Sequence, residues 1–544
     1  MRPVAPRLPS RALALCLAGA LALPVSPALH AQAAPSASPP SAVRLPALGE
    51  AVSDDVSVGA EKRLGEQIMR EIRRDPDYMD DAPLLDYLQA TWSPLVSAAR
   101  QRGDIGADVD TQFAWEAFLV RDRSVNAFAL PGGYVGVHLG LIAMTATRDE
   151  LASVLAHELS HVTQRHIARG SVSASRQGNL AMAAMILGML VASRANNADV
   201  AQAAVMGSQA AAAQGQLNFS RDMEREADRV GLAVLEGAGF AGAGMAAMFE
   251  KLDHANRLND SGAYPYLRSH PLTTERIGEA RQRAASSGTA PRPLLWHSLM
   301  QARARVLMDP SSQALARLQD LDSNTASAGP NERAAALYAS ALASALLRDS
   351  ARAERAWAAA WALPRSGISR EDAAAERALA LLGAQVALQR GDAARAMDRL
   401  ARLRDDESRP AQLQRAQAAL AWQASAGADQ AAADAALRAS AEALQTWTAE
   451  HRKDSAAWTA LSQVADRLGL KLRAVRAEAE SRAAIGDLGG AIDRLRAGQR
   501  LARQRTQADF IEASVIDARL RDLLAQQRQL MADSRGPQRQ QPQE

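Results

Sequence analysis

The clearest chemical signal in the sequence is the pentapeptide His157-Glu158-Leu159-Ser160-His161, an HExxH motif. On a helix, two histidines four residues apart lie on the same face, where their ring nitrogens can bind one metal ion. The glutamate beside the first histidine is then placed to take a proton from water. The motif predicts a zinc centre, one ion per chain, with His157 and His161 as ligands and Glu158 as catalytic base. The alternative is that ordinary hydrogen bonds satisfy these groups, which the apolar residues around them disfavour.

A catalytic zinc site takes three protein ligands and keeps one position open, so a third ligand must come from elsewhere in the chain. The segment Glu224-Arg-Glu-Ala-Asp228 offers one. On a helix, Glu224 lies at the edge of the apolar stripe, Asp228 follows one turn later, and Glu226 points toward the charged face. We expect Glu224 to be the third ligand and Asp228 to orient a histidine or polarise the site. A surface network of Glu and Arg side chains is the alternative for this segment.

The HExxH motif must be carried by a helix with a defined start. Thr147 followed by Glu150 is a capping-box pattern, which predicts a helix over 147–169. On the wheel of that helix, His166 falls on the side opposite His157 and is not expected to be a ligand.

Other elements surround this helix. A helix over 222–236 carries the second motif, and the glycines after it favour its termination. Apolar side chains spaced three and four apart predict two further helices between residues 50 and 102. Between 113 and 142, β-branched and aromatic residues flank the turn 131–133, which predicts a small antiparallel sheet. The expected fold class is zincin-like α+β: mainly α, with a small β-sheet in the peptidase domain.

The strand after this turn is a candidate for binding substrate. Gly133, Val135 and Val137 alternate along it, so its backbone could pair with a substrate as an added β-strand. Such binding reads extended backbone rather than side chains, which suits unfolded or misassembled protein substrates.

The N-terminus has the pattern of a secretory signal. Three arginines precede the apolar run 12–23, and Ala-Gln-Ala at 31–33 follows as a cleavage site. We predict that residues 1–33 are a cleaved signal peptide and that the Pro-, Ser- and Ala-rich segment 34–48 is a linker. The only cysteine, Cys16, leaves with the signal. Cleavage also leaves 60 basic residues against 60 acidic ones, and no nucleic-acid partner is expected.

A second apolar run, 180–192, consists of thirteen uninterrupted apolar or Gly residues. This length fits a buried, re-entrant or interfacial segment better than a transmembrane helix. A core or lid helix is favoured, because neither flank shows the basic face of an interfacial anchor. We expect no transmembrane span in the mature protein, with peripheral membrane contact as the alternative.

The C-terminal half is Ala- and Leu-rich helix with short breaks. Asp349, Asp392 and Asp487 each begin a similar segment at a helix-to-helix turn. Small residues at helical spacing resemble degenerate tetratricopeptide repeats, although an Ala-rich composition alone could give the same pattern. The predicted regions are a zinc metallopeptidase domain over 49–290, an α-helical tetratricopeptide-like repeat domain over 291–515 and a disordered tail over 526–544.

Four motifs together resemble one family. NAFALPGG, HELSH, NFSRDMEREADRVG and SHPLTTERI are similar to motifs of the CAAX prenyl endopeptidase and HtpX family of zinc metallopeptidases, closest to its secreted, repeat-bearing bacterial members of the β-barrel assembly-enhancing type. The likeness spans about 43–283 and extends weakly through the repeats. It implies zinc ligands at His157, His161 and Glu224, the base at Glu158 and an auxiliary acid at Asp228. The absence of expected membrane spans argues against processing of prenylated proteins.

The resemblance also places the loop of His270 near the zinc site. His270 is therefore a candidate substrate contact or a fourth ligand that blocks the open position, and a helix-start residue without chemical role is the alternative. Arg276, one turn into the next helix, is a weaker candidate for supporting the same site.

The function implied is that of a periplasmic zinc endopeptidase. Its substrates would be misfolded or misassembled envelope proteins, outer-membrane β-barrel proteins above all, and its repeats would bind the substrate or the outer-membrane β-barrel assembly machinery. The alternative is a chaperone or assembly scaffold whose zinc site is vestigial or closed.

Overall fold

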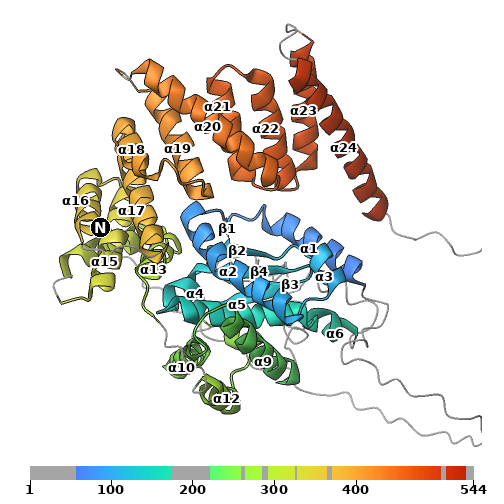
Figure 1. The fold of residues 1–544 in the computed structure, drawn as a ribbon, viewed down its shortest axis with the longest axis vertical. Helices are drawn as coiled ribbons and strands as arrows, with labels where there is room; N and C mark the ends of the chain where they lie inside the picture. The colour runs from blue at the N-terminus through green and yellow to red at the C-terminus, as the bar shows by residue number, and fades with distance from the viewer. Residues whose placement is uncertain are drawn as a thin grey trace, which may run out of the picture. The chain divides into compact units, whose positions relative to one another are not determined.

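Helices with one small sheet make up the computed structural model, as Figure 1 shows. This confirms the predicted fold class, mainly α with a small β-sheet followed by a helical array, while the tetratricopeptide likeness of that array stays a prediction. The predicted signal peptide, the linker and the apolar run 180–192 lie outside the described residues. The structure describes residues 57–172, 221–258, 264–284, 292–324, 327–363, 370–425, 427, 429–503 and 510–534.

The sheet has four strands in the order β1-β2-β4-β3. They are β1 (Tyr78–Met79), β2 (Glu116–Val120), β3 (Ala127–Leu130) and β4 (Tyr134–His138). β3 and β4 form an antiparallel hairpin, but β2 runs parallel to β4. The prediction of an antiparallel sheet is therefore wrong for this pair. The reason is that residues 121–126 carry the chain past the position beside β2, which β4 then fills.

The hairpin turn 131–133 depends on glycine. Gly132 and Gly133 have φ values of 79° and 86°, in the left-handed region that residues with a Cβ rarely adopt. Helix α1 (Val58–Ile72) packs directly against the turn, because a Cβ on Gly65 would lie only 1.9 Å from the carbonyl oxygen of Pro131. The turn and α1 together fix the hairpin that carries β3.

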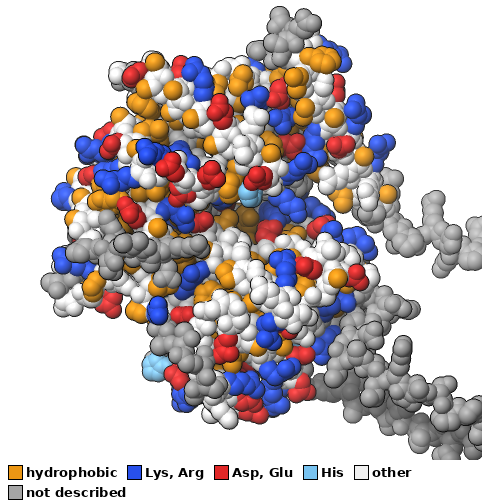
Figure 2. Space-filling view, in the orientation of Figure 1, with side chains coloured by type: hydrophobic (Ala, Val, Ile, Leu, Met, Phe, Trp, Pro, Cys, Tyr) orange, Lys and Arg blue, Asp and Glu red, His pale blue; other side chains and the backbone are white. Residues whose placement is uncertain are grey.

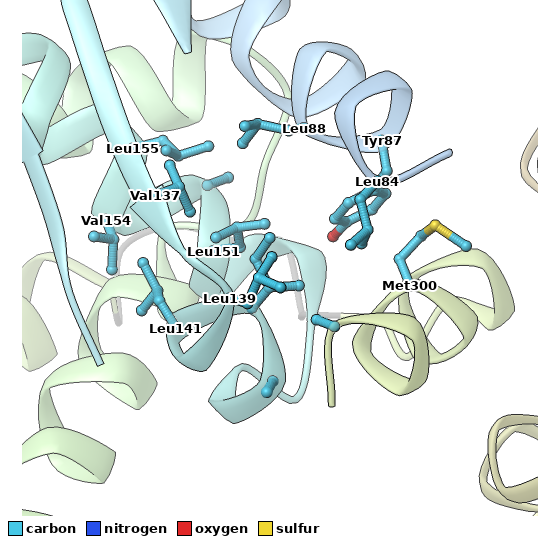
Figure 3. Close-up of a cluster of buried hydrophobic side chains, with 14 of the residues drawn as sticks. Leu84, Tyr87, Leu88, Val137, Leu139, Leu141, Leu151, Val154, Leu155 and Met300 are labelled. Atoms are coloured by element: carbon cyan, nitrogen blue, oxygen red, sulfur yellow. The ribbon is translucent and has the colours of Figure 1, made fainter. Parts of the chain in front are cut away.

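The helices of the N-terminal half pack on the sheet or on one another. After α1 they are α2 (Ala82–Arg102), α3 (Ala107–Gln112), α4 (Leu139–Met144), α5 (Arg148–Thr163), α6 (His166–Val172), α9 (Arg221–Gly237), α10 (Ala243–Leu258), α11 (Pro265–Ser269) and α12 (Thr274–Ala284). Helix α5 carries the HExxH motif and contacts β3, β4, α2, α9 and α10. It is thus the central helix of this half. Figure 3 shows apolar side chains of α2, α4, β4 and α5 meeting in one buried cluster, among them Leu84, Leu88, Val137, Leu139, Leu151 and Leu155.

Helix α5 begins where the sequence predicts and ends earlier. The Thr147 hydroxyl accepts a hydrogen bond from the backbone N–H of Glu150, as the capping pattern requires. The predicted helix over 147–169 is nevertheless wrong at its C-terminal end, because α5 stops at Thr163 and α6 starts at His166. Between them Arg165 has a φ of 51°, and its guanidinium bonds Glu61 of α1 at 2.8 Å. This ion pair stabilises a backbone conformation that is unfavourable for a residue with a side chain.

The C-terminal helices follow one another in pairs. They are α13 (Leu295–Leu307), α14 (Ser312–Gln319), α15 (Pro330–Leu346), α16 (Ser350–Ala362), α17 (Arg370–Gln389), α18 (Ala393–Leu400), α19 (Arg409–Gln423), α20 (Gln430–Glu450), α21 (Ser455–Arg467), α22 (Lys471–Ala484), α23 (Leu488–Ala502) and α24 (Phe510–Ser534), with 3₁₀ turns at Asp320–Asn324 and Ala401–Leu403. Asp349, Asp392 and Asp487 are the N-caps of α16, α18 and α23, and each side chain accepts a backbone N–H from three residues later. The recurrence at helix starts is confirmed and has a capping role.

Helix α24 corrects the predicted disordered tail over 526–544. The helix continues to Ser534, so residues 526–534 are helical, and residues 535–544 lie outside the described residues. Ile516, Leu520 and Leu523 pack α24 against its neighbours. Gln, Arg, Leu, Met and Ala have high helix propensity, so a helix nucleated by that packing continues through them. Low hydrophobicity alone therefore does not predict disorder in this segment.

One buried core connects the two halves of the described chain. The cluster that contains Leu84 and Leu155 also contains Leu299 of α13, Tyr338 of α15 and Leu382 of α17. Around the start of α2, aspartates bind arginines from three C-terminal helices. These ion pairs are Arg303–Asp81, Arg377–Asp86 and Arg409–Asp80, with shortest N–O distances of 2.6, 2.7 and 2.7 Å.

The surface is mixed in charge. Figure 2 shows Lys and Arg side chains interspersed with Asp and Glu over the visible face. Among the helices that the structure describes, none combines the length and apolarity needed to cross a bilayer.

Buried His297 at the junction between α13 and α4 predicts that acid will destabilise the fold. Its Nδ1 lies 2.6 Å from the Tyr87 hydroxyl and its Nε2 lies 2.9 Å from the Thr145 carbonyl oxygen. Burial lowers the pKa of His297 from 6.5 to about 4, so the unfolded chain takes up a proton at a pH where the folded chain does not. Between pH 6.5 and 4 the free energy of unfolding should fall by about 3 kcal/mol from this group. Thermal denaturation at stepped pH should show a shallower fall for His297→Asn, and parallel curves for the two proteins would contradict the assignment.

Candidate metal centre

Four buried side chains bring potential metal ligands to one point. They are His157 and His161 of α5, Glu224 of α9 and His270 at the end of α11, and one ligand atom of each lies within 4.8 Å of the others. The two Nε2 atoms of His157 and His161 are 3.0 Å apart. The Glu224 carboxylate lies 3.5 Å from His157 Nε2 and 3.4 Å from His161 Nε2, and 3.0 Å from His270 Nδ1. Each of the three residues predicted as zinc ligands is therefore in the cluster, together with the candidate fourth.

Close packing of α9 on α5 lets Glu224 reach the histidines. At Gly231 the two helices approach so closely that a Cβ would lie 3.1 Å from the carbonyl oxygen of Ala156 and 3.2 Å from the Cα of His157. The predicted helix over 222–236 matches α9 to within one residue at each end. Its apolar face, including Val234 and Leu235, enters the core. A charged residue on that face needs a polar partner, and the histidines of α5 provide it.

Glu158 lies beside the four clustered residues and is as deeply buried as they are. Its side chain is 0% exposed, and the polar group that acts on its carboxylate from the sheet is the backbone N–H of Ala129. His270 Nε2 is 3.5 Å from its Oε1. Burial raises the pKa of Glu158, and His270 and His157 offset this only in part. A carboxylate with a raised pKa is a better proton acceptor at neutral pH than an ordinary one.

Asp228 lies behind His157, on the side away from Glu224. Its Oδ1 is 2.9 Å from His157 Nδ1, while Arg276 donates to both of its oxygens at 2.6 and 2.8 Å. Burial by itself would raise the pKa of Asp228, but the hydrogen bonds from Arg276 and His157 lower it. For His157, burial lowers the pKa but Asp228 and Glu224 outweigh it and raise it to about 10. A proton and a metal ion would therefore compete for this ring.

Arg276 connects three parts of the centre. Besides Asp228, its Nη1 lies 2.8 Å from Glu224 Oε2 and donates to the carbonyl oxygen of Pro271 at 2.9 Å. It thereby ties the loop of His270 to α9. Burial by itself would raise the pKa of Glu224, but the contacts of its carboxylate with His270 and His157 lower it, and Arg276 adds an ion pair to the same carboxylate.

Sequence reasoning missed three residues beside the cluster. His166 Nδ1 lies 2.9 Å from His161 Nδ1, and its Nε2 lies 3.0 Å from Glu226 of α9. Tyr266 stacks on His270 with ring centroids 4.7 Å apart. The helical wheel excluded His166 because it assumed one continuous helix, but the left-handed Arg165 returns the chain toward His161. No feature of Tyr266 in the sequence set it apart from other tyrosines.

The predicted substrate strand needs correction. Gly133, Val135 and Val137 lie in or beside β4, which is paired with β2 on one side and β3 on the other. An added strand needs a free edge, so β4 cannot accept one. The alternation of side chains along a strand does not distinguish an interior strand from an edge strand. In the sheet order β3 is the terminal strand, and it lies against α5, where the backbone N–H of Ala129 acts on Glu158.

The clustered residues fit a metal ion. Two histidines and a carboxylate are a nitrogen–oxygen donor set that suits zinc. The imidazole nitrogens that face each other at 3.0 Å, with the ionised Glu224 beside them, leave a polar point that a cation would stabilise. His157, His161 and Glu224 would hold the ion, and His270 is close enough to join them.

A small sheet beside an HExxH helix, with a glutamate brought in from a second helix, defines the class of HExxH metallopeptidases. Consistent with this, residues 97–284 match the profile of Peptidase family M48. The chain therefore contains an M48 peptidase domain.

Relatives with similar sequences carry related names. A β-barrel assembly-enhancing protease of Vibrio cholerae is 37% identical over 276 residues, which are 51% of this chain and 52% of the relative. The β-barrel assembly-enhancing protease of Escherichia coli is 33% identical over 305 residues, or 56% and 59%. The mitochondrial metalloendopeptidase OMA1 of Schizosaccharomyces pombe is 30% identical over 238 residues, or 41% and 61%. The chain thus spans a little over half the length of the relatives it matches.

Proposed function

We propose that this protein is a zinc-dependent endopeptidase that degrades misfolded or misassembled proteins of the cell envelope. The observation that carries the proposal is the buried cluster of His157, His161 and Glu224 with the fully buried carboxyl group of Glu158 beside it. Burying these groups without a function would cost stability, because polar groups in an apolar interior need partners. The M48 match over residues 97–284 supports peptide bonds as the target.

The chain's own residues divide the work of hydrolysis. A bound zinc ion would supply a Lewis acid that acidifies water and polarises a carbonyl group. Glu158 takes the proton of the attacking water on a carboxylate oxygen and passes it to the leaving amine. Asp228 holds the Nδ1 side of His157, so that Nε2 faces the cluster. Arg276 keeps the carboxylates of Glu224 and Asp228 in place.

The edge of β3 that faces away from β4 pairs with no described strand, and it is the surface on which an extended substrate would bind. The N–H of His138 donates to the carbonyl oxygen of Asn126, so alternation along the hairpin directs the backbone groups of Ala127 and Ala129 away from β4. A substrate strand on that edge would run beside Glu158. Because such pairing uses backbone groups, it selects unfolded chain over folded domains. This assignment replaces β4 as the substrate strand.

A direct test compares one substrate in two states. The purified mature protein with zinc should cleave a reduced, unfolded test protein and leave its disulfide-bonded native form intact, and a chelator should stop cleavage that added zinc restores. Cleavage of both forms at equal rates would contradict selection for extended chain. Cleavage that survives the chelator would contradict the zinc mechanism.

A second function follows from the position of His270. Its Nδ1 is 3.0 Å from Glu224 and its Nε2 is 3.5 Å from Glu158, so the imidazole occupies the space between a ligand and the base. A ring there would take the fourth zinc position and leave none for water. The protein would then act as a chaperone or assembly scaffold until the loop of His270 moves.

Replacing His270 tests whether the site is closed. His270→Ala should raise cleavage of unfolded protein by at least about tenfold, because an open position is required for water. Rates of peptide release from wild type and variant, each at one zinc per chain, give the comparison. Unchanged or lower activity would count against the closed state and favour a substrate contact.

Location and partners complete the proposal. The relatives' names refer to β-barrel assembly, and the N-terminal pattern of this chain favours export to the periplasm. We assign the helical array the role of binding the substrate or the outer-membrane β-barrel assembly machinery. The full mature chain carrying Glu158→Gln should retain such partners in a pull-down from envelope extracts, because it cannot cleave and release them.

A further inference from the structure

A chain of hydrogen bonds leads from the metal centre to the surface through His166. His161 Nδ1 lies 2.9 Å from His166 Nδ1, and His166 Nε2 lies 3.0 Å from Glu226 Oε2. The same carboxylate oxygen accepts from Arg169 Nη1 at 2.9 Å. The two histidine side chains are fully buried, whereas Glu226 is 28% exposed. Four residues from α5, α6 and α9 are thus linked in a line.

The acceptor at the outer end fixes the direction of the hydrogen bonds. An ionised carboxylate only accepts, so His166 must carry its proton on Nε2 to bond Glu226. In the neutral ring Nδ1 is then a bare acceptor, and the proton between the two rings belongs to His161 Nδ1. The opposite tautomer of His161 would point an N–H from Nε2 into the ligand cluster, where it could not bind a metal ion.

We propose that His166, oriented by Glu226 and Arg169, is a positioning residue that holds His161 as the Nδ1–H tautomer and presents its Nε2 to the metal. The proposal rests on the zinc site proposed above. His166 does not touch the ligand cluster itself and acts through His161. Asp228 holds His157 in the same manner from the other side, so each histidine of the HExxH motif has its own orienting residue.

The turn between α5 and α6 brings His166 into contact with His161. Had α5 continued, His166 would face away from His157, as the helical wheel indicates. The left-handed Arg165 reverses that direction, and its ion pair with buried Glu61 of α1 offsets the cost of the conformation. The energetically unfavourable backbone therefore coincides with the residue that orients the ligand.

Two substitutions of His166 separate orientation from packing. His166→Leu fills the space without an acceptor, whereas His166→Asn keeps an acceptor oxygen near the position of Nδ1. We expect His166→Leu to weaken zinc binding by about 10- to 100-fold, and His166→Asn to stay within about threefold of wild type. Competition with a chromophoric chelator measures the zinc dissociation constant. The ¹⁵N shifts of His161 report the tautomer directly, and the melting temperature of the zinc-free protein reports folding.

A matched pair of carboxylates extends the test beyond His166. Glu226→Ala removes the carboxylate at the outer end of the hydrogen-bond chain. Glu275→Ala removes a carboxylate of α12 that bonds Arg225 of α9 at 3.1 Å and is not part of that chain. Only Glu226→Ala should weaken zinc binding. If His166→Leu fails to fold, the comparison of Glu226→Ala with Glu275→Ala still tests the proposed role of His166.

Three results would overturn the proposal. They are wild-type zinc affinity in His166→Leu, equal loss in His166→Asn and His166→Leu, and equal effects of Glu226→Ala and Glu275→Ala. If the wild-type protein itself binds no zinc, the proposed function fails and this inference fails with it. Wild-type zinc binding with an indifferent His166 removes only the inference.

Discussion

Glu158→Gln should reduce cleavage of unfolded protein by about 10²- to 10⁴-fold, the usual contribution of a general base. The amide has the shape of the carboxylate but cannot accept the proton of the attacking water. The amide oxygen of glutamine can still accept the backbone N–H of Ala129, so the change keeps this contact with the sheet. It also removes a buried charge, so the melting temperature should be equal to or higher than that of wild type.

Three measurements on one preparation make this test decisive. Zinc per chain should stay near that of wild type, the melting temperature should not fall, and peptide release should be lost. Glu275→Gln, an exposed glutamate beside the same centre, is the control and should change none of them. Activity above about one tenth of wild type would mean that another group serves as base. Loss of zinc together with activity would instead assign Glu158 to holding the centre together.

His161→Ala should remove the metal and the activity together. His161 is fully buried and offers its Nε2 to the cluster, so its loss takes away one of three principal ligands. Zinc affinity should fall by at least about a thousandfold, because a site with three principal protein ligands draws its binding energy from the complete set. Mass spectrometry under native conditions should find about one zinc per wild-type chain and close to none in the variant.

The control for this loss is another buried histidine. His138 hydrogen-bonds Ser124 at 2.9 Å and lies outside the cluster, so His138→Ala makes a similar cavity but should keep its zinc. Zinc retained in His161→Ala, or lost equally from both variants, would refute the assignment of the ligands. A wild-type chain without zinc would favour the scaffold function.

The sequence predicted those parts of the centre that depend on short-range pattern. His157, His161 and Glu158 belong to one helical spacing, and Thr147 caps that helix as expected. Glu224 could be placed because its position on an amphipathic helix is also a matter of local periodicity. Such features follow from spacing along one element and need no knowledge of the tertiary structure.

The predictions that were wrong concern features that depend on long-range contacts. The end of α5 is decided by Arg165, whose left-handed backbone is stabilised by Glu61 more than a hundred residues earlier. That one residue reverses the direction of His166, which no helical wheel could reveal. Similarly, whether β4 is an edge strand or an interior strand depends on where β2 pairs, and the residues of β4 itself do not indicate that pairing.

The core shared by α2, α5 and the helices α13, α15 and α17 has a consequence for how the protein unfolds. Because these apolar side chains belong to one buried cluster, we expect the peptidase region and the first helices of the array to unfold as a single cooperative unit. Any ligand that binds α13 to α17 would stabilise the metal centre by mass action without touching it. The lifetime of the folded protein would then depend on the occupancy of its array, and a fragment cut near residue 290 would lose that protection along with the buried residues that α13, α15 and α17 contribute to the core.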